Sequence, residues 1–162
     1  MRLSRALSLL APLAFAACLS GTDPVTFQNI PIESTTFSSN LNVNLAASTK
    51  LPSGMYYRDI IVGTGKTVAT GDSIAVYYQG AFTNGQLFDQ RLSPSPAFEF
   101  KLGANRVIPG WDEGLVGTKV GGVRQLIIPP SLAYGSSGSG PIPPYAVLVF
   151  NVTISNDFTA GP

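Results

Sequence analysis

The chain has 162 residues, a formal net charge of +1 and only 12% charged residues. A charge balance this close to neutral provides no basic surface for a phosphate backbone, so we expect no nucleic-acid partner. Histidine is absent, which excludes Ser-His-Asp and Cys-His catalysis as well as His-ligated zinc.

The contents of cysteine, glycine and proline narrow the class of fold. The single cysteine, Cys18, excludes an intrachain disulfide. The 17 glycines and 13 prolines predict short strands joined by tight turns. The length is enough for one domain of roughly 100 residues with its own hydrophobic core, and for additional segments.

Residues 1–17 have the order of an export signal. Arg2 and Arg5 precede an apolar stretch over residues 6–15, and small residues then precede Cys18. The apolar stretch is too short to span a bilayer comfortably. We therefore predict a signal peptide over residues 1–17; the alternative is a buried N-terminal helix of the folded domain.

Residues 15–18, FAAC, resemble a bacterial lipobox, which implies that Cys18 is lipidated and becomes the first residue of the mature protein. Phe15 departs from the leucine that is usual at the first position of that motif. The competing interpretation is cleavage after Ala16, with Ala14 and Ala16 as the small pair, which would release a soluble protein. The expected location is the bacterial cell envelope through a lipid anchor, and the alternative is a secreted or periplasmic soluble protein.

A linker is predicted over residues 18–50, because this segment is rich in Ser, Thr and Asn and nearly uncharged. Alternation of apolar and polar residues at 25–27 and 41–45 permits a short edge strand there. The folded domain is expected over residues 51–157, followed by a short tail at 158–162.

Strands dominate the predicted domain. Asn84-Gly85 favours a hairpin with a two-residue type I′ turn, because both residue types tolerate a positive φ. Alternating patterns and turn residues predict strands over residues 55–62, 73–78, 86–89, 98–102, 123–128 and 146–154. Two sets of apolar residues each share one strand face: Ile74, Val76, Tyr78 and Phe82, and Leu148, Phe150, Val152 and Ile154.

Residues 109–118 differ from the strands around them. Trp111 and Leu115 have helical spacing, and Asp112 and Glu113 are acidic residues in the first turn. We predict one helix of two or three turns packed on a twisted antiparallel sheet of five or six strands, an α+β domain with an apolar pocket between helix and sheet.

Five segments occur in the order and spacing of the FKBP family of peptidyl-prolyl cis/trans isomerases: 77–80 (YYQG), 85–89 (GQLFD), 107–115 (VIPGWDEGL), 132–135 (LAYG) and 142–150 (IPPYAVLVF). The resemblance implies the fold of that family, a half-barrel sheet wrapped around one short helix. It implies an enzyme that rotates X-Pro bonds of unfolded or folding polypeptides without metal or cofactor, and that has macrolides as potential inhibitors.

The resemblance also implies roles for individual residues. Trp111 corresponds to the indole on which the substrate proline rests, Asp89 to the carboxylate facing the isomerising amide, and Tyr134 to the phenol that donates to a substrate carbonyl. Tyr78 joins these three in the expected catalytic set. The expected substrate-binding residues form the apolar walls, a backbone donor and the flap above: Phe88, Phe98, Val107, Ile108, Ile142 and Phe150.

Two features depart from the family pattern. Where the family commonly has an arginine that braces the aspartate, this chain has Pro94, so Asp89 is expected to be oriented by Arg91 or by tyrosine hydroxyls alone. The loop between Tyr134 and Ile142 is rich in Ser and Gly and short. Because of these two departures, the resemblance does not predict the substrate preference or the macrolide affinity of this chain.

The expected function is an active isomerase that assists the folding of exported proteins. One alternative is a non-catalytic module that binds proline-containing segments or acts as a holding chaperone, and another is a purely structural role. A monomer is expected, because the chain lacks the long charged helical N-terminal module of the dimeric envelope members of the family.

Overall fold

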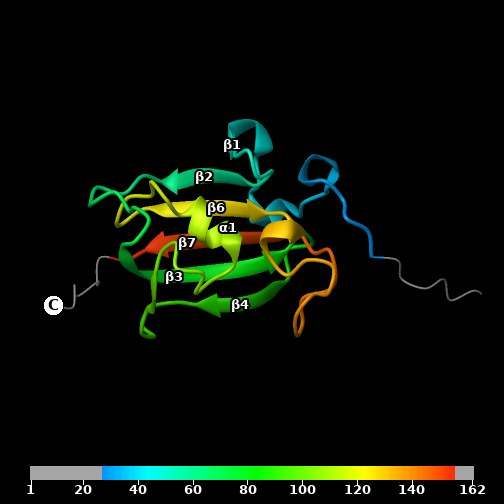
Figure 1. Ribbon diagram of the computed structural model, residues 1–162. Helices are drawn as coiled ribbons and strands as arrows, with labels where there is room; N and C mark the ends of the chain where they lie inside the picture. The colour runs from blue at the N-terminus through cyan, green and yellow to red at the C-terminus, as the bar shows by residue number, and fades with distance from the viewer. Residues whose placement is uncertain (1–26, 156–162) are drawn as a thin grey trace, which may run out of the picture.

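The computed structural model describes residues 27–155 (Figure 1). The predicted signal peptide, the predicted lipidation site Cys18 and the tail at 158–162 lie outside the described residues. Within the described part of the chain, no helix has the length and apolar character that crossing a membrane requires.

The described residues form an antiparallel sheet of seven strands with one short α-helix, α1, on one face (Figure 1). The strand order is β1-β2-β6-β7-β3-β4, and β5 pairs with the first part of β3. The strands are β1 Thr49–Lys50, β2 Tyr56–Ile61, β3 Ser73–Phe82, β4 Leu87–Arg91, β5 Phe98–Lys101, β6 Val123–Ile128 and β7 Leu148–Ile154. The predicted α+β class is confirmed, and the two-residue β1 adds to the expected strands.

The two predicted apolar strand faces both point toward α1. Their residues belong to one hydrophobic core together with Trp111 and Leu115, and Val76, Leu148 and Val152 are fully buried. Alternation with a period of two was enough to predict which residues face α1, because only one face of these strands contacts the helix.

Helix α1, Pro109–Gly114, is shorter than the predicted helix over residues 109–118. Gly114 is a poor helix former, and Gly117 adopts a positive φ of 82° that ends the segment in a turn. Gly110 and Gly114 have a packing role, because a Cβ on Gly110 would lie 2.5 Å from Ile128. The absence of these side chains lets α1 lie directly on β6.

The hairpin between β3 and β4 is present, but its turn differs from the predicted type I′ turn. Only Gly85 has a positive φ, of 87°, and its N–H donates to the Phe82 carbonyl at 2.9 Å. The Asn84 side chain accepts a hydrogen bond from the Gln86 N–H at 2.9 Å, which fixes Asn84 without the left-handed conformation. The loop is therefore one residue longer than predicted, with glycine in the position that requires it.

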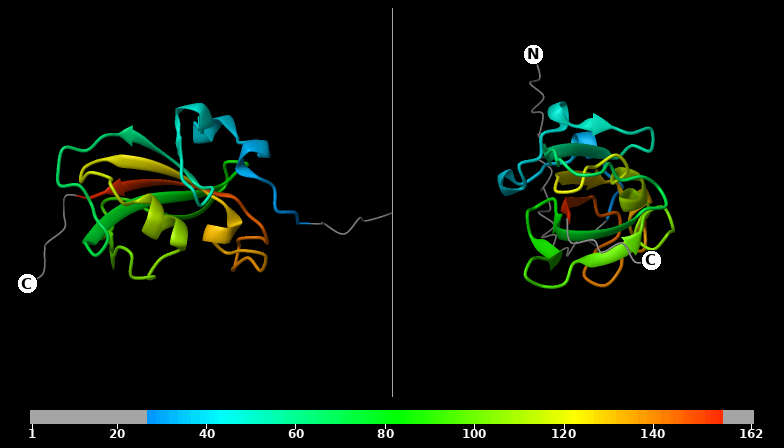
Figure 2. Two further views of the ribbon diagram at one scale, coloured as in Figure 1. Left: turned by 45° about the horizontal axis from the view of Figure 1, so that its top comes forward. Right: turned by 90° about the vertical axis from the view of Figure 1, so that its left-hand side faces the viewer.

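Residues 32–50, placed in the predicted linker, pack on the face of the sheet opposite α1 (Figure 2). Three 3₁₀ turns, Ile32–Ser34, Ser39–Leu41 and Leu45–Ala47, replace the edge strand considered for 41–45. Ile32 and Leu41 are buried against Tyr56, Ala81, Ile127, Val147 and Val149. The few apolar residues of this segment thus cover a second, smaller hydrophobic cluster.

Side chains of the sheet also hold this segment through its backbone carbonyls. Gln125 Nε2 donates to the Leu41 carbonyl at 2.8 Å, and Arg58 Nη2 donates to the Asn42 carbonyl at 2.6 Å. Glu33 accepts hydrogen bonds from Lys50 and from the Tyr56 hydroxyl, and these bonds lower the pKa of Glu33 to about 2. The packed region therefore begins before the boundary predicted at residue 51.

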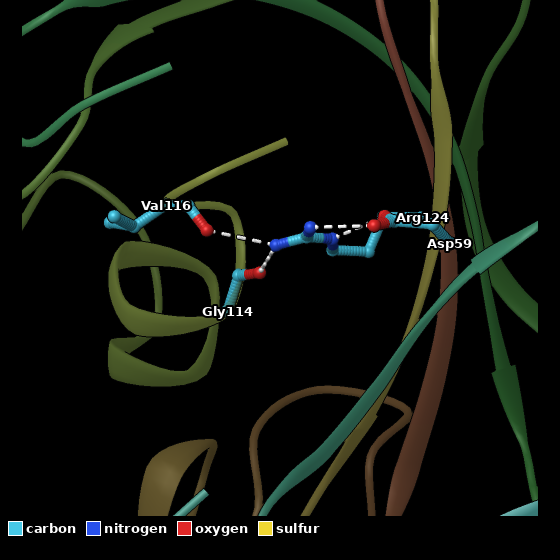
Figure 3. A network of polar contacts seen from close by, with 4 residues as sticks. All are labelled: Asp59, Gly114, Val116 and Arg124. Atoms are coloured by element: carbon cyan, nitrogen blue, oxygen red, sulfur yellow. Dashed lines mark hydrogen bonds and ion pairs between the residues drawn. The ribbon is translucent and has the colours of Figure 1, made fainter. Parts of the chain in front are cut away.

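A buried arginine joins the helix to the sheet (Figure 3). Arg124, in β6 and 3% exposed, forms two hydrogen bonds with the cross-strand carboxylate of Asp59, at 2.7 and 2.9 Å. Its Nη1 donates to the carbonyls of Gly114 and Val116, at 3.0 and 2.8 Å. A cation at a helix C-terminus satisfies carbonyls that have no partner within the helix, so Arg124 fixes the end of α1 over β6.

We predict that Arg124→Met lowers the free energy of unfolding by about 3 kcal/mol, because it leaves the Asp59 carboxylate and two carbonyls without their donor. Urea denaturation followed by circular dichroism measures the change.

Lys66→Met is the control, since the Lys66–Asp72 ion pair is exposed at the lysine and should contribute little. Equal effects of the two variants would contradict the special role of Arg124.

Candidate functional site

A cavity of about 220 Å³ opens between α1, strands β3, β4, β5 and β7, and the loops on either side. Its lining combines six aromatic rings, two aliphatic side chains and two charged groups: Tyr78, Phe88, Asp89, Phe98, Arg106, Val107, Ile108, Trp111, Tyr134 and Phe150. An apolar hollow with few polar groups is the usual form of a ligand site.

The cavity brings together the four residues of the predicted catalytic set, Tyr78, Asp89, Trp111 and Tyr134. Of the predicted substrate-binding residues, Phe88, Phe98, Val107, Ile108 and Phe150 also line it. Ile142 does not line the cavity; it is 7% exposed and packs in the hydrophobic core behind it. The roles assigned to these residues remain predictions.

Trp111 forms the floor of the cavity and belongs to the core at the same time. Its indole is 4% exposed. The rings of Tyr78 and Phe150 meet it edge-on, with centroid distances of 5.1 and 5.3 Å and interplanar angles of 81° and 87°. Phe98 and Phe100 contact it from β5. Edge-to-face packing of this kind holds a ring in one orientation, so the floor is fixed without hydrogen bonds.

Gly80 makes the aromatic wall possible. It lies opposite Phe150 in the β3–β7 pairing and opposite Asp89 in the β3–β4 pairing. A Cβ at this position would lie 2.5 Å from the Phe150 ring and 2.8 Å from the Phe88 ring. Only glycine leaves room for both rings on this face of the sheet, which explains the last residue of the YYQG segment.

Asp89 is oriented by a tyrosine. The Tyr78 hydroxyl donates to Asp89 Oδ2 at 2.7 Å, from the neighbouring strand. Arg91 instead donates from Nη1 to the Pro96 carbonyl at 3.2 Å. Of the two arrangements considered from the sequence, the structure therefore has the tyrosine hydroxyl in contact with the carboxylate.

This arrangement raises the pKa of Tyr78 to about 12. Burial of the phenol is the largest cause, followed by the hydrogen bond to Asp89 and its negative charge; the positive charge of Arg91 acts in the opposite direction. Tyr78 therefore stays protonated and remains a hydrogen-bond donor throughout the physiological pH range.

The loop after β6 forms the rim that carries Tyr134, whose side chain is 37% exposed. Its carbonyl accepts from the Gly138 N–H at 3.1 Å, and Ser139 and Ile142 exchange backbone hydrogen bonds at 2.9 and 2.8 Å. Ile142 thus anchors the base of this Ser/Gly-rich loop. Tyr134 itself lines the cavity and is partly exposed at its rim.

Arg106 lines the cavity but was not singled out from the sequence. The Asp112 carboxylate accepts hydrogen bonds from the N–H groups of Gly103 and Asn105, at 2.7 and 3.0 Å, and so fixes the loop that precedes Arg106. Arginine is normally a solvated surface residue, so its residue type does not indicate a place in the site. The only sequence signal was its position immediately before the VIPGW segment.

We predict that Tyr78 titrates near pH 12. The variant Asp89→Asn should lower the pKa of Tyr78 but leave it above the ordinary 10.0, because the burial of the phenol remains. Stabilisation of the neutral phenol is complete below pH 10 and is lost as the pH rises through about 12. NMR of ¹³Cζ-labelled tyrosine measures the titration, and Tyr78→Phe assigns the signal. A Tyr78 signal that titrates at the ordinary 10.0 would contradict the arrangement.

Comparison with known proteins gives related sequences and structures. Residues 64–155 match the family model described as FKBP-type peptidyl-prolyl cis-trans isomerase. FK506-binding protein 4 of Dictyostelium discoideum is 48% identical over 105 residues, which cover 64% of this chain and 28% of that protein. The chain thus spans less than a third of the length of this relative.

Solved structures show the same fold. FkpA from Escherichia coli has a TM-score of 0.62 and 36% identity, over 68% of this chain and 51% of its own. AtFKBP13 has a TM-score of 0.62 and 35% identity, over 66% of this chain and 95% of its own. With more than half of its residues matched by the family model, this chain belongs to the FKBP-type peptidyl-prolyl cis-trans isomerase family.

Proposed function

We propose that this protein accelerates cis/trans rotation about X-Pro bonds in polypeptides, and that the cavity over Trp111 is its active site. The observation that carries the proposal is the composition of that cavity: six aromatic rings and two aliphatic side chains surround a carboxylate that accepts a hydrogen bond from the half-buried phenol of Tyr78. A proline ring fits such an apolar hollow, and the polar groups at its edge suit the peptide on either side.

The chemistry follows from the electronic structure of the amide. Partial double-bond character sets a rotation barrier of about 18–20 kcal/mol. In the twisted transition state the nitrogen lone pair is decoupled from the carbonyl, so the amide is less polar than in its planar ground state. A water-poor aromatic site stabilises that state relative to the planar one, and this difference accelerates the rotation.

Hydrogen bonds add an orientational contribution. The proline ring would rest on Trp111, the Ile108 N–H and the Tyr134 hydroxyl would hold the carbonyls of the flanking chain, and Asp89 would face the amide that rotates. Fixing one half of the substrate while the other turns lowers the entropic part of the barrier. The reaction breaks no bond, so these residues need only bind and orient.

The predicted catalytic set leads to a direct test. Asp89→Asn should lower kcat/KM by about tenfold, since it removes a charged group at the reacting amide, and Trp111→Leu should lower it further by removing the floor. Exchange NMR on an Ala-Leu-Pro-Phe peptide measures the rate.

Glu99→Gln removes a carboxylate that lies outside the cavity and should leave the rate unchanged. We further propose that FK506, named in the curated relatives, occupies the same cavity and suppresses the activity. Uncatalysed exchange at micromolar wild-type protein would overturn the enzymatic proposal, and peptide binding without acceleration would favour a binding module or holding chaperone.

We also propose that the protein acts on exported polypeptides from the bacterial cell envelope, attached through a lipid on Cys18. The support is the sequence of residues 1–18, with basic residues, a short apolar stretch and FAAC in that order. Intact-mass analysis of protein from a bacterial membrane fraction should show a chain that begins at Cys18 and carries acyl groups. A mature chain that begins at Ala17 without lipid, or an unprocessed chain, would contradict the anchor.

A further inference from the structure

A second, larger cavity of about 440 Å³ lies beside the proposed active site. We call it the side groove. Its lining comes from the N-terminal segment, the β3–β4 turn and the end of the loop before β7: Phe27, Gln28, Ile30, Thr35, Phe82, Thr83, Asn84, Pro143, Pro144, Tyr145, Ala146 and Val147. None of these side chains carries a charge, and most are apolar.

Two large apolar residues of the side groove are exposed. Phe27 is 46% exposed and Ile30 is 48% exposed. Both precede residue 64, where the match to the family model begins. A third of the lining residues, four of twelve, therefore come from a segment outside the matched domain. Exposed apolar surface gathered at a hollow is characteristic of a binding site.

A chain of aromatic ring contacts joins the lining of the side groove to the lining of the proposed active site. Phe82, in the groove, lies 5.0 Å from Phe88, in the active-site wall, and Phe88 lies 5.5 Å from Phe150. Phe150 in turn lies 5.3 Å from Trp111. These distances are between ring centroids, so only packed aromatic side chains separate the two cavities.

One loop also serves both cavities. It begins with Tyr134 at the rim of the active site and ends with Pro143, Pro144 and Tyr145 in the side groove. The Tyr145 N–H donates to the Gly135 carbonyl at 2.9 Å, which ties the two ends of the loop together. The relative position of the two cavities is therefore set by backbone hydrogen bonding.

We propose that the side groove is a second subsite for the same client polypeptide, and that it takes an aromatic or leucine side chain while a proline occupies the cavity over Trp111. This inference rests on the proposed function. An uncharged apolar lining selects an apolar side chain, and the exposed amide of Gln28 is available to the client backbone. The short separation of the two cavities and the loop that serves both favour one client chain, passing over the rings between them, over a second copy of this protein.

Geometry limits the spacing between the two client residues. The ring path from Trp111 to Phe82 is no longer than about 16 Å, which about five residues of extended chain span. A tetrapeptide substrate would therefore fill the active site alone. A longer client would gain affinity when its apolar residue lies at the matching distance from the proline.

The test uses the full chain and a set of twelve-residue peptides with a central Ala-Leu-Pro-Ala. A single phenylalanine replaces one flanking serine, three to six residues before or two to five residues after the proline, and exchange NMR gives kcat/KM for each peptide. At the matching spacing, phenylalanine should raise kcat/KM by about fivefold through partial burial of its ring.

The double variant Phe27→Ser/Ile30→Ser should abolish this gain. The control variant Ile60→Ser/Val62→Ser also replaces two exposed apolar residues, which are 46% and 67% exposed, but both lie outside the side groove. This control should preserve the gain. Sedimentation velocity on each variant checks that the assembly state is the same.

The outcomes separate this inference from the proposed function. If the serine peptides themselves are not accelerated, the proposed function fails. If all peptides are accelerated equally, the proposed function stands and the side groove is not a client subsite. A gain that survives in the Phe27→Ser/Ile30→Ser variant also overturns the inference, as does a dimer of the wild type that this variant abolishes.

Discussion

The contact between one indole and the rings around it is the constraint on which the fold and the site both depend. Trp111 comes from the short helix, whereas Tyr78, Phe98 and Phe150 come from three different strands. Because the same ring closes the hydrophobic core and forms the cavity floor, core packing fixes the site geometry. Arg124 reinforces this constraint from the other end of α1 by binding the carbonyls of Gly114 and Val116. The floor of the site is therefore part of the hydrophobic core.

On the polar side of the site, one side chain both packs in the core and orients the carboxylate of Asp89. A carboxylate at an apolar cavity needs a partner that fixes its direction. Here the phenol of Tyr78 provides it, one of the two partners expected from a sequence that has Pro94 where the family pattern has an arginine. Tyr78 combines two roles, since its ring packs edge-on against Trp111 and its hydroxyl binds Asp89. One side chain thus links the apolar floor to the charged wall.

Much of this arrangement follows from the sequence, and the remainder has identifiable causes. Alternating residues in β3 and β7 predicted the face that packs on α1, because successive side chains of a strand point to opposite faces of the sheet. The turn at Asn84-Gly85 was predicted with the wrong type, since the Asn84 side chain satisfies the backbone of Gln86 in a way that composition does not reveal. Residues 32–50 were assigned to a linker because they are rich in Ser, Thr and Asn, nearly uncharged, and alternate only briefly at 41–45. Ile32 and Leu41 are buried only through tertiary contacts. Arg106 was missed for the same reason, since only the folded loop brings it to the cavity.

The position of Trp111 has a practical consequence. It is the single tryptophan in the chain, it is buried, and its Nε1–H has no hydrogen-bond acceptor among residues 27–155. The intrinsic fluorescence of the protein therefore originates from one indole in a dry environment, at the floor of the cavity, and its emission should lie at short wavelength. Occupancy of the cavity is thus open to optical detection without any attached label, and loss of the core would shift the same signal toward the red.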